Sequence, residues 1–146
     1  MSALPPITAS AIISFSTELE ARSEAFYDAL CARFPEQGTA FRSMAQECAK
    51  SSTQVTRTYQ ETITDALEAG FSFAGISLAE YEVETELPAE ADLPQAVGQA
   101  LALEETAIAF YEAVAESSDS LLATIPRAFR RVAKTRRRRR DKLEAI

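Results

Sequence analysis

Two stretches of the chain decide the fold: residues 20–27 read EARSEAFY, and residues 104–111 read EETAIAFY. In each stretch a glutamate is followed six and seven positions later by Phe-Tyr. Apolar side chains around both stretches recur at steps of three and four residues, which is the pattern of a helix with one buried face. We therefore expect two helices that carry the same short pattern, in a fold built from two related halves.

A second pair of stretches supports this internal repeat. Residues 41–45 read FRSMA, and residues 129–133 read FRRVA. The first lies downstream of EARSEAFY and the second downstream of EETAIAFY, at nearly the same separation. Each half is thus predicted to be a helical hairpin, with a slightly longer loop in the second half.

Start and stop signals predict the extent of the helices. The four expected helices span about residues 9–34, 39–69, 93–117 and 125–145. The predicted capping residues are Thr8 or Ser10, Thr39, Gly70 and Asp92. Residues 70–92 lose the helical period and are rich in acids, so we expect a long crossover, with a short helix near Leu78 to Tyr81. The chain is therefore predicted to be one all-α domain over residues 1–146, a four-helix bundle of two helical hairpins joined by that crossover.

Composition limits the function classes. Hydrophobic residues make up 47% of the chain, and no stretch approaches the roughly 18 uninterrupted apolar residues of a membrane span. Cys31 and Cys48 are the only cysteines and do not form a Cys-x-x-Cys pair, so we interpret them as small, buried, reduced residues. These features predict a cytoplasmic protein with no membrane partner.

Charge is divided unevenly along the chain. Residues 127–146 hold ten of the fifteen Lys and Arg, although the net charge is −7. The run Arg136 to Arg140 points all ways around a helix, and no aromatic residues alternate with it, so the sequence argues against nucleic-acid binding. The outward basic residues are instead expected to pair with acidic helices of this chain or of a partner subunit, with the acidic crossover as an obvious candidate. They are Arg130, Arg131, Lys134, Arg137 and Arg138, and the crossover acids are Glu80, Glu82, Glu84, Glu86, Glu90 and Asp92.

The chain resembles the rubrerythrin-type branch of the ferritin-like superfamily from about Ile12 to Leu143. In that family, a Glu with a downstream Phe-Tyr stands on helices one and three, and a Glu-x-x-His stands on helices two and four. These six side chains hold two irons inside a bundle of two hairpins joined by a crossover. The resemblance implies that Glu20 and Glu104, followed by Tyr27 and Tyr111, match the first half of this pattern.

The second half of the family pattern is missing. The ligand positions of helix two fall on Cys48 and Ser51, those of helix four fall on Arg136 and Arg139, and the chain contains no histidine. Arginine keeps its proton and has no lone pair to give, so it repels a metal ion. The resemblance therefore implies a dismantled di-iron site.

Two buried, unpaired carboxylates would be costly. We expect Arg136 and Arg139 to act as counter-charges for Glu20 and Glu104 through forked hydrogen bonds. The resemblance further implies that Tyr27 and Tyr111 lie near these carboxylates. Two alternatives remain open: these charged residues lie on solvated helix flanks, or a residual metal site uses Glu20 and Glu104 with Glu47 and Cys48.

Three functions follow from these site hypotheses. The first is a non-catalytic structural or interaction protein without a cofactor, forming a homo-oligomer such as a dimer or a subunit of a larger assembly. The second is a rubrerythrin-type oxidoreductase that binds iron through the depleted ligand set. The third is an adaptor that binds an anionic partner through Arg137, Arg138 and Arg140 of the last helix.

Overall fold

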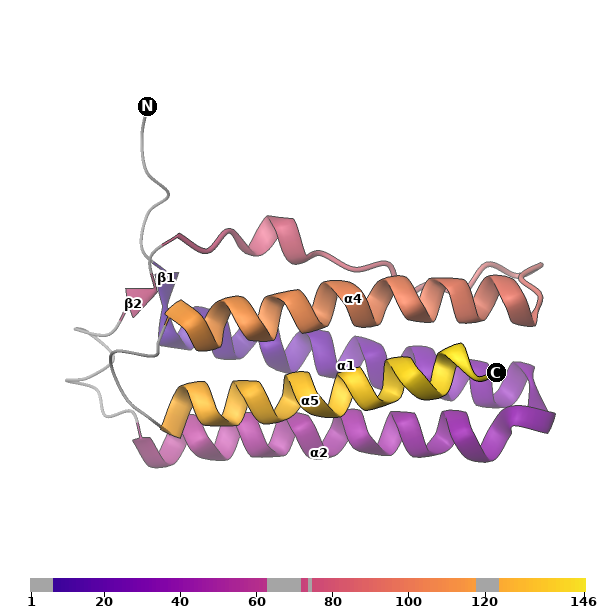
Figure 1. Cartoon of the computed structure of the whole chain (residues 1–146), viewed down its shortest axis with the longest axis horizontal. Coiled ribbons are helices and arrows are strands. Elements are labelled where there is room, and N and C mark those ends of the chain that lie inside the picture. Colours follow the sequence, from indigo (N-terminus) through magenta and orange to yellow (C-terminus); the bar gives the residue numbers. More distant parts are fainter. Residues whose placement is uncertain (1–6, 63–71, 74, 118–123) are drawn as a thin grey trace.

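Four long helices form an elongated bundle in the computed structural model (Figure 1). The structure describes residues 7–62, 72–73, 75–117 and 124–146. The helices are α1 (Ala9–Arg33), α2 (Gly38–Thr62), α4 (Leu93–Ser117) and α5 (Thr124–Glu144). The all-α bundle predicted from the sequence is confirmed for these residues. None of the described helices is long and apolar enough to cross a membrane.

The helices pair as two antiparallel hairpins. α1 packs most extensively on α2, and α4 on α5, while α2 also packs on α5 and α1 on α4 (Figure 1). A short 3-10 helix, η1 (Pro35–Gln37), joins the first pair. Each helix runs antiparallel to both of its neighbours, so the interior is lined by one face from each of them.

The crossover returns along the length of the bundle before α4 begins (Figure 1). It contains the 3-10 helix η2 (Leu78–Tyr81), at the place predicted from the sequence. Arg22 of α1 donates hydrogen bonds to the carbonyl oxygen of Val83 at 2.7 Å and to Thr85 Oγ1 at 3.2 Å. Gln99 of α4 donates to two further crossover carbonyls, at 3.2 and 3.0 Å. The crossover therefore lies against α1 and α4.

Two very short strands, which the sequence analysis did not anticipate, lie at one end of the bundle. β1 (Ile7–Thr8) pairs with β2 (Ser72–Phe73) in antiparallel fashion. This pairing ties the residues before α1 to the start of the crossover. The buried Phe73 ring closes this end of the core.

Two of the predicted helix caps are present and one is wrong. Thr8 Oγ1 accepts the backbone N–H of Ala11 at 3.1 Å, and Asp92 exchanges two 2.9 Å hydrogen bonds with Gln95 as a capping box. Thr39 is not a cap, because η1 leads directly into α2 and the helix already begins at Gly38. The predicted continuation of the second helix to residue 69, with its Gly70 cap, lies outside the described residues.

Most of the core comes from one apolar face of each helix, but several apolar residues that helical periodicity would bury are only half-buried. These are Phe15 of α1, Phe34 directly after it, Tyr59 of α2, and Val97 and Leu101 of α4, where Ala96, Ala100 and Leu103 occupy the interior instead. The small alanines allow the backbone of α4 to approach its neighbours, which rotates the larger side chains toward the edge of the bundle. This rotation places Glu104, one position after Leu103, on the interior face.

Candidate functional site

Four charged side chains meet in the middle of the bundle. Glu20 of α1, Glu104 of α4 and Arg136 of α5 are 0% exposed, and Arg139 of α5 is 1% exposed. Arg136 and Arg139 are three residues apart and therefore share the helix face that also buries Phe129. The structure thus brings together the glutamates and arginines that the sequence analysis assigned to one site. The alternative in which they lie on solvated flanks is wrong.

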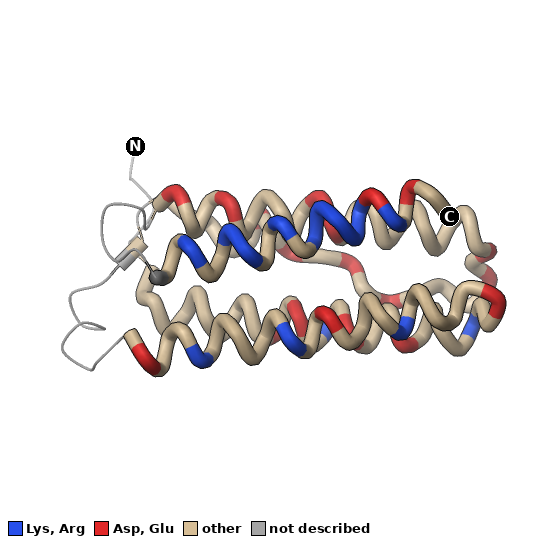
Figure 2. The backbone as a smooth tube through the Cα atoms, turned by 60° about the horizontal axis from the view of Figure 1, so that its bottom comes forward, with Lys and Arg blue, Asp and Glu red and all other residues tan. Residues whose placement is uncertain are grey.

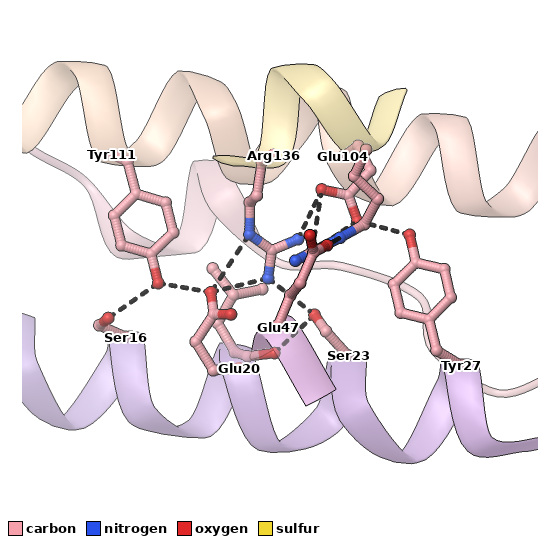
Figure 3. A network of polar contacts seen from close by, with 10 residues as sticks. Ser16, Glu20, Ser23, Tyr27, Glu47, Glu104, Tyr111 and Arg136 are labelled. Atoms are coloured by element: carbon pink, nitrogen blue, oxygen red, sulfur yellow. Dashed lines mark hydrogen bonds and ion pairs between the residues drawn. The ribbon is translucent and has the colours of Figure 1, made fainter. Parts of the chain in front are cut away.

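Arg136 joins the two glutamates directly (Figure 3). Its Nη2 lies 2.7 Å and its Nε 3.2 Å from Glu20 Oε2, and its Nη1 lies 2.8 Å from Glu104 Oε1. Nη2 also donates to Ser23 Oγ at 3.0 Å, and the Ser23 hydroxyl in turn donates to a backbone carbonyl of α1 at 2.7 Å. One guanidinium therefore links α1, α4 and α5.

Arg139 extends the network to α2. Its Nη1 lies 3.3 Å from Glu104 Oε2, and its Nε lies 3.2 Å from Glu47 Oε1. The side chain of Glu47 is 29% exposed, so this pair lies at the edge of the core. All four long helices thus contribute a charged residue to one network. Within the described part of the chain, Glu20 Oε1 and Arg139 Nη2 are buried and have no hydrogen-bond partner.

Two tyrosines complete the site in a reciprocal arrangement (Figure 3). Tyr27 of α1 donates to Glu104 Oε2 at 2.5 Å, and Tyr111 of α4 donates to Glu20 Oε2 at 2.6 Å. Each Phe-Tyr motif therefore contacts the glutamate of the other half, as expected if the halves are structurally equivalent. The Tyr111 hydroxyl also lies 2.9 Å from Ser16 Oγ. The guanidinium of Arg139 lies 5.5 Å from the ring centre of Tyr27, within the range of a cation–π contact.

Electrostatics favours the charged forms of Glu104, Arg136 and Arg139. Burial alone would raise the pKa of Glu104, but Arg136 and Arg139 outweigh it and hold that pKa below its usual value. Burial works against the charged form of Arg136, yet Glu104 and Glu20 raise its pKa well above the normal value. Burial and the neighbouring carboxylates raise the pKa of both Tyr27 and Tyr111. Both tyrosines are therefore neutral hydrogen-bond donors at neutral pH.

The ligand positions assigned to the second helix carry poor ligands. Cys48 and Ser51 of α2 are buried, at 0% and 3% exposure. Burial raises the pKa of the Cys48 thiol to about 12, although the two nearby arginines oppose this shift. A thiol binds metal as the thiolate, so Cys48 is held in the wrong form for a ligand. The residual site proposed from Glu20, Glu104, Glu47 and Cys48 is therefore poorly equipped.

The residues of the network do not fit a di-iron centre. Oxygen atoms of Glu20 and Glu104 that would face the metals accept hydrogen bonds from Arg136, and two fixed positive charges occupy the space between the helices. Among the residues that the structure describes, no group of three or more Cys, Asp or Glu side chains is placed to hold a metal ion. Carboxylates engaged by cationic donors are not free to coordinate iron.

The outward arginines of the last helix divide into two groups. Arg137 pairs with Glu112 and Arg140 Nη1 lies 3.1 Å from Glu105 Oε1, so both bind α4, while Arg138 is exposed. The Arg137 pair confirms the expected pairing with an acidic helix of the same chain, whereas in the described part neither Arg137 nor Arg138 forms an ion pair with the acidic crossover. The physical reason is that Val83 and Leu87 pack on the core, which holds the crossover against α1 and α4.

Two serines of the network were not recognised as functional positions. The sequence analysis assigned no role to either Ser16 or Ser23. Both stand one helical turn away from Glu20, on its own face. A serine on an otherwise apolar stripe was the available signal, because a buried hydroxyl needs a hydrogen-bond partner.

Comparisons with known proteins add no identification: no family model, curated protein or solved structure matches this chain.

Proposed function

We propose that the chain is a ferritin-like bundle of the rubrerythrin type in which two arginines have taken the place of the metal ions. It acts as a non-catalytic structural or interaction protein. The observation that carries this proposal is the position of the Arg136 guanidinium, which lies 2.7 Å from Glu20 and 2.8 Å from Glu104. Fixed protein cations there supply the positive charge that the two carboxylates need.

The helix arrangement supports the family part of the proposal. Two antiparallel hairpins joined by a crossover that runs the length of the bundle correspond to the ferritin-like connectivity. The reciprocal bonds from Tyr27 to Glu104 and from Tyr111 to Glu20 relate the two halves, as an internal duplication would. The pairing of these particular residues also agrees with the family motif on helices one and three.

The same network argues against the oxidoreductase alternative. Chemistry at a di-iron site depends on metal ions that bind the oxidant and change oxidation state, and this chain's residues provide no ligand set for them. Arginine cannot be deprotonated, and two guanidinium groups repel any entering cation. The network instead connects all four helices. Its role in this proposal is to fix the positions of the helices relative to one another.

Metal analysis tests the proposal. The protein is expressed in iron-supplemented medium, purified without chelator and measured by elemental analysis. We expect well under one iron per chain, because Arg136 and Arg139 occupy the metal position. Stoichiometric iron that is lost in the Glu20→Ala, Glu104→Ala double variant would overturn the proposal and establish the oxidoreductase alternative.

A gain-of-function variant provides the matched control. Cys48→Glu, Ser51→His, Arg136→Glu and Arg139→His together place a Glu-x-x-His on both α2 and α5. If the variant folds, as judged by its helical circular dichroism, we expect it to retain iron that the natural chain does not. If both proteins retain equal iron, the arginines are not what excludes the metal, and the proposal fails.

A further inference from the structure

The outer face of α5 carries a stripe of positive charge. Lys and Arg residues are frequent along this helix (Figure 2), and five of them, at steps of three and four residues, have exposed side chains. This basic face consists of Arg127, Arg131, Lys134, Arg138 and Lys142. None of the five forms an ion pair with another residue of the described chain. At a rise of 1.5 Å per residue, the stripe is roughly 22 Å long, with a charge about every 5 Å.

The crossover carries a matching stripe of negative charge. Between Glu82 and Glu86, acidic and half-buried residues alternate, so every second side chain points to solvent. An extended chain repeats such positions about every 6–7 Å, close to the spacing along α5. The exposed acids of the segment are Glu80, Glu82, Glu84, Glu86, Glu90 and Asp92. In the described chain Glu82 has one exposed ion pair, with Arg22 at 3.7 Å.

The two stripes cannot neutralise each other within one molecule. The crossover is held against α1 and α4 by Arg22 and Gln99, whereas α5 packs between α4 and α2 (Figure 1). Both stripes run along the axis of the bundle, so two bundles lying side by side could align them. A polyanion such as RNA is a poorer match for the basic face, since the chain has a net charge of −7 and would repel it at other faces.

We propose that the basic face of α5 is a docking surface for the acidic crossover of a second copy of this chain. Because the two surfaces lie on different faces, the contact is heterologous and leaves one surface of each kind available on the pair. Such contacts build rings or open chains of subunits instead of a closed twofold dimer. This inference stands on the surface charges alone and does not depend on whether the core holds a metal.

Two charge-reversal variants test the proposal. The first carries Arg131→Glu, Lys134→Glu and Arg138→Glu. The second carries Glu80→Lys, Glu86→Lys and Glu90→Lys, whose side chains make no hydrogen bond or ion pair in the described structure. Analytical ultracentrifugation is run on each variant, on the natural chain and on an equal mixture of the two variants. The salt concentration is varied from about 50 mM to about 0.5 M, because added salt shortens the Debye length from roughly 14 to 4 Å.

We expect the natural chain to form assemblies at low salt that dissociate at high salt toward the 15.9 kDa monomer. Each variant alone should remain monomeric, because it carries two surfaces of the same sign. The mixture should assemble again, because the acidic crossover of one variant then meets the basic face of the other. Circular dichroism confirms that both variants keep their helices.

Three results would overturn the proposal. The natural chain could remain monomeric at low salt and high protein concentration. The crossover variant could assemble as well as the natural chain, which would show that the basic face meets a different surface. The natural chain could also bind a synthetic RNA more tightly than it binds itself, with binding lost in the α5 variant, which would assign the face to a polyanion.

Discussion

Replacing Arg136 by methionine is the sharpest perturbation of the core network. Methionine has a similar length and fits a helix interior, so the substitution removes the charge with little change in packing. Arg136 donates three hydrogen bonds to carboxylate oxygens and one to Ser23. After the substitution, Glu20 loses its hydrogen bonds from Arg136 and keeps the one from Tyr111. Its carboxylate remains fully buried.

The size of the effect follows from the burial of both partners. Removing one member of a buried ion pair costs about 3–5 kcal/mol, and Arg136 serves two carboxylates, so we expect the upper half of that range. A bundle of this size has a total stability of roughly 5–15 kcal/mol. The substitution should therefore lower the melting temperature by roughly 10–20 °C, at about 2–4 °C per kcal/mol.

Urea unfolding followed by circular dichroism measures this loss, with Arg138→Met as the matched control, in about 0.5 M salt so that the proposed contacts between copies are screened. Arg138 is exposed on the same helix, so its substitution should change the unfolding free energy by less than about 0.5 kcal/mol. The double variant Glu20→Leu, Arg136→Met removes both members of a pair and should be more stable than Arg136→Met alone. A cost for Arg136→Met no larger than that of the control would refute the reasoning.

Three further predictions concern the groups around the arginines. Tyr27→Phe and Tyr111→Phe should each lower the unfolding free energy by about 1–3 kcal/mol, because each removes a short hydrogen bond to a buried carboxylate oxygen that then keeps only its arginine donors; urea titration checks this, and two neutral variants would contradict it. Because the pKa of Glu104 is lowered in the folded state, its contribution is present above the usual glutamate pKa of about 4.3 and lost as the pH falls below it. Glu104→Gln should flatten the loss of stability between about pH 5 and pH 3, and an unchanged slope would count against the network. Cys48, buried and with its pKa raised to about 12, should resist a disulfide reagent in the native protein while the half-buried Cys31 reacts, and both should react in denaturant; equal rates in the native state would contradict the structure.

Much of the site could be predicted because helix periodicity is strict. On α5, the apolar residues before Arg136 define a narrow buried face. Arg136 stands four positions after Val132, so helical periodicity places it on the same face. Periodicity alone is compatible with either Arg139 or Arg140 on this face, since adjacent positions differ by only about 100° around a helix. The structure decides it: Arg139 is 1% exposed, and Arg140 reaches Glu105 at the surface.

Other features depended on how the helices are rotated against each other. The start of α4 offers alanine or leucine on several sides, so the sequence alone could not identify which line faces the core. The ion pair between Glu47 and Arg139 joins α2 to α5. It forms only at a certain distance between these two helices, and the sequence pattern of a single helix does not determine that distance. Charge complementarity alone favoured a crossover that lies beside the arginines of α5. The crossover instead lies where its apolar side chains Val83 and Leu87 pack against the core.

The central claim is that guanidinium groups stand between Glu20 and Glu104, at the position where rubrerythrin-type bundles hold metal ions. Crystals of protein expressed with added iron, measured with anomalous diffraction at the iron absorption edge, test it most directly. We predict planar guanidinium density for Arg136 bridging the two carboxylates, as in Figure 3, and no anomalous peak between the helices. One or two strong anomalous peaks between the glutamates, with the Arg136 side chain turned away, would contradict the account.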